Sequence, residues 1–302
     1  ALALSRPDSV EADEARLSLA QSFLIQARFA EIVELVQQVR AVDHPEHAVE
    51  AQFIWGTALS IEGADLQAAA EHLQDAEALL NQLGDRAAPT QRSQVKFEIG
   101  SVVAQQGDLP QAVALYRESL AIAGQANTPA ADLRGILARN NLAYHLHLLG
   151  DPSAVEHARA GLALAQEKGE LALQPFLLST LGEIALAAED FESAERYFND
   201  GLMLAERLSI PERITGLTAN LGLLARATGQ TDLAIHRLST ALARADSLGL
   251  RHLAAQTRLW LISLLPPAEA RARLAEARAI AEAGDRRQLL EEVKRLESSN
   301  FQ

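Results

Sequence analysis

The hydrophobic positions of this 302-residue chain recur in a six-point pattern. An apolar residue is followed by Gly or Ala, and a large apolar residue comes three positions after that small residue. After a turn there is a small residue, then an apolar residue four positions on, and a second small residue three positions further. The clearest copy consists of Ile99-Gly100, Val103, the turn Gly107-Asp108, Ala112, Tyr116 and Ser119.

Offsets of three and four put these residues on one stripe of an α-helix, so each copy predicts two helices joined by a turn. Small residues at facing positions let the two helices of a pair, and the next pair, approach closely. A final second helix is predicted after Pro266-Pro267, where a helix can begin but not continue. We call the Gly or Ala of each first helix the mark of its repeat. The marks are Ala20, Gly56, Gly100, Ala143, Gly182 and Gly222.

A helical hairpin repeated in register along nearly the whole chain resembles the tetratricopeptide repeat. The resemblance implies an all-α fold, a right-handed superhelical solenoid of about seven hairpins in which stacking of neighbours supplies the core. We expect residues 1–302 to form a single solenoid domain with a C-terminal capping helix at residues 285–299. The expected hairpins span residues 10–42, 46–84, 90–125, 129–168, 171–208, 211–248 and 251–283.

Successive marks are 36 to 44 residues apart, which exceeds the tetratricopeptide standard of about 34. Long Ala- and Leu-rich repeats of this kind resemble the central region of the bacterial maltose-regulon activator family. That resemblance implies an effector-sensing module that lies between an ATPase and a DNA-binding domain. Because the chain begins Ala1-Leu2 without methionine, we expect a fragment of a longer protein.

The C-terminal stretch from Asp285 to Ser299 predicts one amphipathic helix with an apolar stripe that includes Leu289 and Val293. Its other side is charged, which suits a solvating cap over the last hairpin. The alternative is a docking helix for a neighbouring domain.

Composition and charge exclude several classes of ligand and site. The net charge is −13, and residues 1–100 carry 16 Asp and Glu against 7 Lys and Arg. A duplex-binding domain normally has a basic face, so we expect no direct nucleic-acid ligand.

The chain has no cysteine, which excludes disulfides and thiolate metal sites. No segment approaches 18 consecutive apolar residues, and we expect a cytoplasmic protein without a membrane span.

The motifs of common enzymes are missing from the sequence. There is no Gly-Lys dipeptide for a phosphate-binding loop, no His-Glu-x-x-His and no Gly-x-Ser-x-Gly. His44 and His47 fall in a linker, where a solvated loop is the alternative to a metal pair. His145 and His147 are two apart on a helix and therefore point to different faces. We expect no catalytic residue, no metal and no cofactor.

The tetratricopeptide resemblance implies that the first helix of each hairpin lines a concave groove. The residues next to the marks are therefore the candidate ligand-binding or partner-binding residues. In the first two repeats these positions hold a more apolar set, and the Lys and Asn of a chaperone-type carboxylate clamp are not found there. In repeats three to six the candidates are Phe97, Glu98, Ser101, Asn140, Asn141, Tyr144, His147, Ser179, Thr180, Glu183, Asn220 and Arg226.

Asn141 and Asn220 both lie two residues before a mark, where peptide-binding relatives such as kinesin light chains and peptide-pheromone receptors place asparagines. An amide offers a donor and an acceptor and can pair with an extended backbone. The alternative is an asparagine that bonds a neighbouring helix. Tyr144, with Asn140 and His147, forms an aromatic face flanked by polar groups, which suits a sugar or a peptide side chain.

Two non-catalytic functions follow from these features. One is the effector-sensing and protein-interaction module of a larger signalling or transcription-regulatory protein. The other is a scaffold that holds an extended peptide segment in its groove. The expected partner is accordingly a protein, a peptide, a small-molecule inducer or a second copy of the chain.

Overall fold

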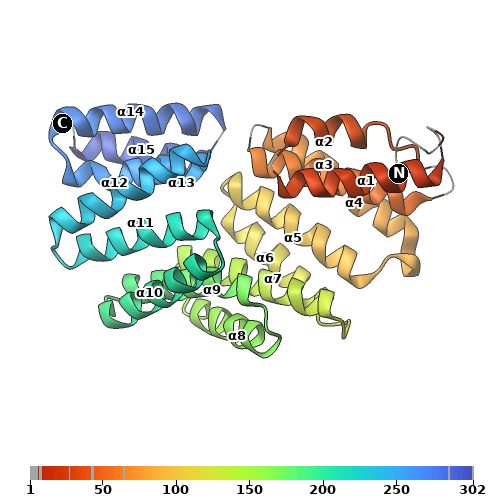
Figure 1. Ribbon diagram of the computed structural model, residues 1–302, viewed down its shortest axis with the longest axis horizontal. Helices are drawn as coiled ribbons and strands as arrows, with labels where there is room; N and C mark the ends of the chain where they lie inside the picture. Colours follow the sequence, from red (N-terminus) through yellow and green to blue (C-terminus); the bar gives the residue numbers. More distant parts are fainter. Residues whose placement is uncertain are drawn as a thin grey trace. The chain divides into compact units, whose positions relative to one another are not determined.

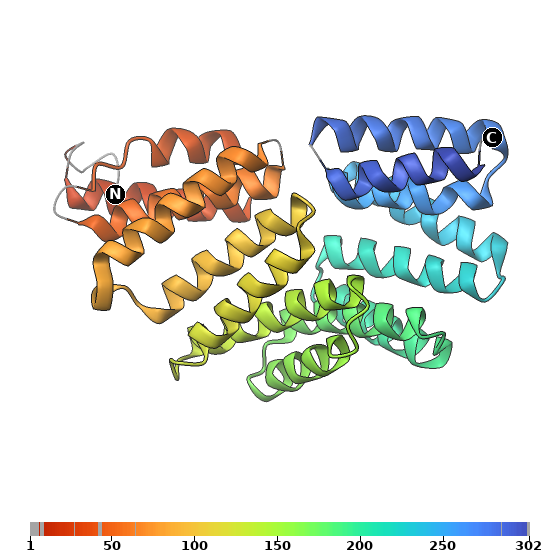
Figure 2. The same ribbon diagram turned by 180° about the vertical axis from the view of Figure 1, so that it is seen from behind.

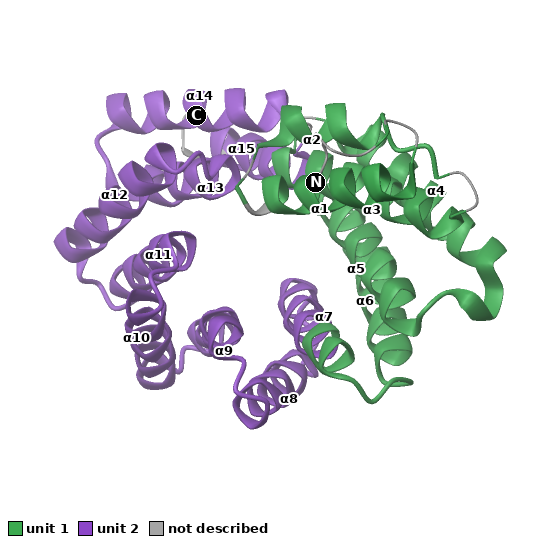
Figure 3. Ribbon diagram, turned by 45° about the vertical axis from the view of Figure 1, so that its right-hand side comes forward, with its two compact units in different colours: residues 1–134 green, residues 135–302 purple. Residues whose placement is uncertain are grey.

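The computed structural model describes residue 6 and residues 9–26, 28–41, 44–63, 65–284 and 286–300. Every regular element within these ranges is a helix. The chain divides into two compact units, residues 1–134 and residues 135–302 (Figure 3). The boundary falls inside helix α7 (Pro129–Leu148).

Unit 1 is a succession of paired helices. Its hairpins are α1 with α2, α3 with α4, and α5 with α6, and a short 3₁₀ turn, η2, follows α4. The bounds are α1 (Val10–Ile25), α2 (Phe29–Val36), α3 (Pro45–Glu62), α4 (Leu66–Leu83), η2 (Gly84–Arg86), α5 (Pro89–Gln105) and α6 (Leu109–Ala123).

Unit 2 continues the same scheme from the greater part of α7. Its remaining elements are α8 (Ala154–Glu167), η3 (Leu171–Leu173), α9 (Gln174–Ala187), α10 (Phe191–Arg207), α11 (Pro211–Ala227), α12 (Thr231–Ser247), α13 (Arg251–Leu261), η4 (Ile262–Leu264), α14 (Pro267–Ala283) and α15 (Arg287–Asn300).

From α8 to α15, each helix of unit 2 packs on its neighbours in sequence, and the first helices α9, α11 and α13 also touch one another. Thus α11 contacts its hairpin partner α12 and, in addition, the first helices α9 and α13. The pairs α9–α10 and α11–α12 lie side by side in Figures 1 and 2. This arrangement, in which contacts run between adjacent hairpins, confirms the all-α solenoid of tetratricopeptide-type hairpins.

Helix starts follow local chemistry. Asp108 and Asp190, the turn residues of two repeats, are N-caps whose carboxylates accept from the backbone N–H groups of Gln111 and Ser193 at 3.0 and 3.1 Å. Proline occupies the first position of five helices, where its missing N–H costs nothing: α3, α5, α7, α11 and α14.

The marks pack as the pattern predicts. A Cβ placed on Gly182 of α9 would lie 2.3 Å from the ring of Phe198 in α10. In the same way, a Cβ on Gly56 would lie 2.7 Å from Cγ of Leu73, and a Cβ on Gly222 would lie 2.8 Å from Cγ of Leu238. The small residue of the first helix thus admits the large apolar residue of the second, and this contact is repeated from hairpin to hairpin.

Helix α15 covers the last hairpin. It contacts α13 and α14, and its Leu289 and Val293 are buried in one cluster with Ala277 and Ala281 of α14. The capping helix is therefore present, and the residue at which we expected it to begin, Asp285, lies outside the described residues.

The expected single domain stays a prediction. Because every hairpin contacts only its neighbours, a solenoid can divide into compact units at any weaker junction without a change of architecture. Each unit is accordingly described by itself. Ala1-Leu2, the basis for expecting a fragment, lies outside the described residues.

Candidate functional site

Unit 2 contains a cleft of about 320 Å³. Four successive first helices, α7, α9, α11 and α13, supply all of its lining. We call it the unit 2 cleft. Its residues are Asn140, Asn141, Tyr144, Phe176, Ser179, Thr180, Glu183, Arg213, Gly216, Asn220, His252, Leu253, Gln256 and Trp260.

A repeated register of hydrogen-bonding side chains runs through the cleft. In each of the first three helices a polar side chain lies two residues before the mark. In α13, Gln256 is the corresponding polar residue. It lies two residues before Arg258, which occupies the position of the mark in place of a small residue. The four side chains at this register are Asn141, Thr180, Asn220 and Gln256.

Asn220 is the centre of a buried hydrogen-bond network between α11 and α9. Its Nδ2 donates to Ser179 Oγ at 3.0 Å and to Glu183 Oε1 at 2.9 Å. Ser179 Oγ donates to the same carboxylate oxygen at 3.0 Å. A carboxylate only accepts, so it fixes which end of the Asn220 amide faces it. Both hydrogens of Nδ2 are thereby used, and Oδ1 is the acceptor that the amide keeps for another donor.

Glu183 lies half-buried in the wall of the cleft. Burial raises its pKa, while the hydrogen bonds from Asn220 and Ser179 and the positive charge of Arg213 act in the opposite direction. Burial also raises the pKa of the Tyr144 hydroxyl, and the charge of Glu183 adds to that effect. The Tyr144 hydroxyl therefore keeps its proton and is available as a donor.

A second link joins α9 to α7. Thr180 is 3 % exposed, and its Oγ1 donates to Asn140 Oδ1 at 3.1 Å. Asn140 Nδ2 in turn lies 3.4 Å from Asn141 Oδ1. Hydrogen bonds thus link polar side chains of α9 to α7 on one side and to α11 on the other, which restricts the rotamers of these side chains.

Arg213 and Phe176 form the side of the cleft nearest the N-terminal ends of α11 and α9. The guanidinium carbon of Arg213 lies 4.3 Å from the centre of the Phe176 ring, a cation–π arrangement. Gly216 lies one turn further along α11, and a Cβ there would meet nothing within 4 Å. The lining is therefore open beside this arginine.

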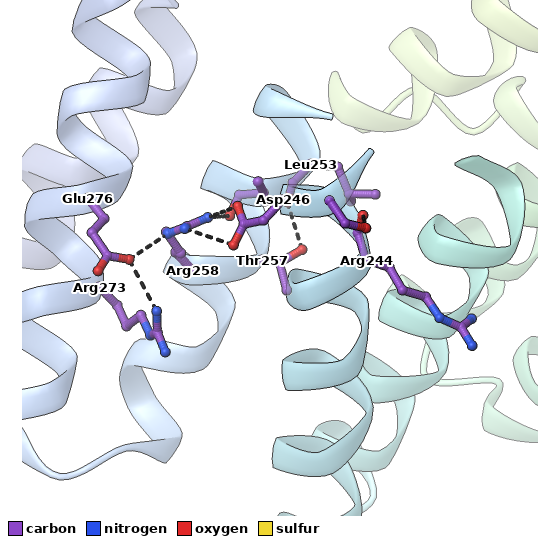
Figure 4. A network of polar contacts seen from close by, with 9 residues as sticks. Arg244, Asp246, Leu253, Thr257, Arg258, Arg273 and Glu276 are labelled. Atoms are coloured by element: carbon purple, nitrogen blue, oxygen red, sulfur yellow. Dashed lines mark hydrogen bonds and ion pairs between the residues drawn. The ribbon is translucent and has the colours of Figure 1, made fainter. Parts of the chain in front are cut away.

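An arginine at the mark position of α13 holds that helix in place. Arg258 donates from Nη1 and Nη2 to the two carboxylate oxygens of Asp246 in α12, both at 3.0 Å. Its Nε donates to Glu276 of α14 at 2.7 Å, and Glu276 also accepts from Arg273 (Figure 4). This network joins α12, α13 and α14, and so positions Gln256 and Trp260 in the cleft.

The structure brings seven of the twelve candidate residues together in the unit 2 cleft. These are Asn140, Asn141, Tyr144, Ser179, Thr180, Glu183 and Asn220.

The other two candidates of unit 2, His147 and Arg226, lie outside the lining. Both residues lie four positions after a mark, toward the C-terminal ends of their helices. Most lining residues of α7, α9 and α11 lie before the marks, toward the N-terminal ends. Arg226 Nη1 donates to the carbonyl oxygen of Trp260 at 2.9 Å and so contacts the backbone of α13.

The candidates of unit 1 lie in α5. Phe97 is 9 % exposed and packs on the ring of Tyr116, with ring centres 5.5 Å apart. Ser101 Oγ donates to the Phe97 carbonyl at 3.2 Å and lies 3.3 Å from the Tyr116 hydroxyl. Burial raises the pKa of Glu98 to about 7, and the charge of Arg134 opposes this. These residues thus contribute to the hairpin core and to its surface.

Sequence reasoning missed the other half of the cleft lining. Phe176, Arg213 and Gly216 lie six to nine residues before their marks, one or two helical turns beyond the positions that we considered. The stripe that they continue was visible in the sequence. The residues of α13 were missed because Arg258 replaces the small residue by which the other first helices were found.

Among the described residues there is no cluster of three or more His, Asp or Glu side chains suited to bind a metal ion. Within the same residues, no helix combines the length and the apolar character that a membrane span requires.

Comparison with known proteins identifies the fold and no family. No protein-family model matches the sequence, and no curated protein matches it. The fold is similar to that of RapI in its apo form, with a TM-score of 0.69 at 12% identity over 94% of this chain and 99% of that chain.

Two further similar structures contain peptides. The Rap conjugation gene regulator of the plasmid pLS20, in complex with the Phr* peptide, has a TM-score of 0.68 at 14% identity over 94% of this chain and 96% of that one. NprR in complex with its cognate peptide NprX has a TM-score of 0.63 at 15% identity over 96% and 84%. At such identities the likeness establishes the helical-repeat fold.

Proposed function

We propose that the unit 2 cleft binds an extended peptide segment and that the chain is a non-catalytic, ligand-sensing part of a regulatory protein. The observation that carries the proposal is the register of Asn141, Thr180, Asn220 and Gln256 on four successive helices. Amide and hydroxyl groups repeated from helix to helix match the donors and acceptors repeated along an extended backbone.

The dimensions of the cleft suggest the length of the ligand. Adjacent packed helices are roughly 8–10 Å apart, so four first helices extend over roughly 25–30 Å. An extended chain rises about 3.3 Å per residue, and about seven to nine residues would therefore cross the cleft. Peptide complexes of NprR and of the pLS20 Rap regulator, which share the fold, support a peptide over a small-molecule inducer.

The experiment is affinity selection of a random heptapeptide pool on the full chain, read by mass spectrometry. Gly216→Phe fills the cleft at a position where the new Cβ meets nothing within 4 Å. Ser239→Phe adds the same bulk at an exposed position of α12 outside the lining. We expect the wild type and Ser239→Phe to retain peptides and Gly216→Phe to lose them. If Gly216→Phe and Ser239→Phe retained peptides equally, the peptides would bind outside the unit 2 cleft.

The regulatory part of the proposal needs its own readout. The long repeat period, which resembles that of the maltose-regulon activator family, supports a cytoplasmic sensor within a larger signalling or transcription-regulatory protein. Native mass spectrometry of the chain with and without a selected peptide separates a sensor from a scaffold. A peptide-dependent change of oligomeric state supports the sensor, and binding without any such change supports the scaffold.

A further inference from the structure

Arg213 in the unit 2 cleft has no hydrogen-bond or ion-pair partner among the described residues. Its Nε–H is buried and donates to no acceptor there. A buried N–H group without an acceptor is unfavourable, and arginine stays charged even when its surroundings disfavour the charge. The side chain is thus a cation whose donors are not used by the chain itself.

The environment of Arg213 fixes the guanidinium without occupying its donors. The guanidinium carbon lies over the Phe176 ring, 4.3 Å from its centre, and this cation–π contact engages the charge of the group without using an N–H donor in a hydrogen bond. The negative charges near it are those of Glu212 in its own helix and of Glu183 in α9, and the neutral hydroxyl of Tyr144 in α7 also lies near it. Glu183 is already engaged by Asn220 and Ser179 at 2.9 and 3.0 Å.

Gly216 provides the second, independent observation. It lies inside α11, where glycine is less favourable than alanine. Unlike Gly182 or Gly222, it has no packing reason to be small, since a Cβ there would meet nothing within 4 Å. It lies three residues after Arg213, on the same face of the helix. The absence of a side chain leaves space beside the guanidinium for a ligand backbone.

We propose that Arg213 binds a carboxylate of the peptide ligand, with the ligand backbone passing over Gly216. This inference rests on the proposed function. A guanidinium fork and a carboxylate pair through two parallel hydrogen bonds, which gives the contact both strength and direction. The carboxylate can be the C-terminus of the peptide or an Asp or Glu side chain, because the chemistry is the same.

Three heptapeptide pools distinguish these sources on the full chain. The first has a free C-terminus and no Asp or Glu, the second has an amidated C-terminus and no Asp or Glu, and the third has an amidated C-terminus with Asp and Glu allowed. We expect the wild type to retain the first or the third pool about 10- to 100-fold better than the second, the range that a charge-assisted pair supports. Preference for the first pool identifies the C-terminus, and preference for the third identifies a side chain.

Variants at position 213 complete the test. Arg213→Gln keeps hydrogen-bonding capacity without charge, and we expect it to retain all three pools equally and weakly. Arg213→Lys keeps the charge without the fork, and we expect an intermediate preference. Thermal melting of each variant checks that the fold is intact.

The outcomes are separable from those of the proposed function. If the wild type retains the carboxylate-free pool as well as the others, the carboxylate inference is wrong and peptide binding stands. An unchanged preference in Arg213→Gln would likewise remove Arg213 from the contact. If no pool is retained, peptide binding fails, and this inference fails with it.

Discussion

Gly182 of α9 lies directly against the ring of Phe198 in α10, so close that a Cβ on Gly182 would be 2.3 Å from Cε1. Phe198 is fully buried. The hairpin therefore depends on the absence of a side chain at residue 182.

Gly182→Leu is expected to lower the free energy of unfolding by about 1–3 kcal/mol or more, because overpacking forces side chains off their rotamers and shifts the backbone. The matched control is Gly216→Ala, in an open helical position, which should raise stability by up to about 1 kcal/mol. Urea denaturation of the three proteins measures both effects. A Gly182→Leu variant as stable as the wild type would contradict the assigned register.

The Arg258 network makes a similar prediction for the last repeat. Arg258→Ala removes the bonds to Asp246 and Glu276, whose side chains are 45% and 47% exposed and can return to water. We therefore expect a moderate loss of about 1–3 kcal/mol. Arg273→Ala removes only an exposed contact to Glu276 and should change stability by less than about 0.5 kcal/mol. Chemical denaturation measures the stability of both variants. Equal losses of stability in Arg258→Ala and Arg273→Ala would show that Arg258 does not join the three helices.

The sequence predicted the hairpins well because the determinant of each is local. A mark such as Gly182 and its partner Phe198 are 16 residues apart, and the pattern that joins them recurs in the first six repeats. The cleft was predicted in part for the same reason, since Asn220 and Thr180 have fixed positions relative to their marks. In α13, the side chain of Arg258 contacts two other helices, and its pairing with Asp246 and Glu276 follows from packing that no single repeat encodes.

Sequence alone left two interpretations of Asn220, and the structure shows that it bonds to a neighbouring helix. Its Nδ2 contacts Ser179 and Glu183 of α9, while its Oδ1 is the group that could accept from a ligand N–H. The two roles can therefore coexist in one side chain.

Asn220→Ala and Ser179→Ala separate these roles. Both variants remove a donor to Glu183 and should lower stability by about 1–2 kcal/mol. Only Asn220→Ala also removes the amide oxygen, so we expect retention of the heptapeptide pool to fall in that variant and to be kept in Ser179→Ala. Affinity selection at a temperature at which both proteins are folded provides the comparison. Equal retention by the two variants would limit Asn220 to a structural role.

Glu98 of α5 makes stability depend on pH. Burial raises its pKa from 4.5 to about 7, against the opposing charge of Arg134. Between these two values the folded state binds more protons than the unfolded state, so stability is greatest below about pH 4.5 and falls as the pH rises to about 7. At 1.36 kcal/mol per pKa unit the loss is at most about 3 kcal/mol.

Glu98→Gln removes this titration. We expect the variant to be more stable than the wild type by about 1–3 kcal/mol at pH 8 and equally stable at pH 4.5. The control is Glu195→Gln at an exposed position beyond the first turn of α10, which makes the same chemical change away from Glu98. Urea denaturation of each protein at both pH values measures these free energies of unfolding. A neutral Glu98 no longer attracts Arg134, so Arg134→Gln should cost more stability at pH 8 than at pH 4.5. A wild type and a Glu98→Gln variant with parallel pH profiles would show that Glu98 ionises in the folded protein as freely as in the unfolded chain.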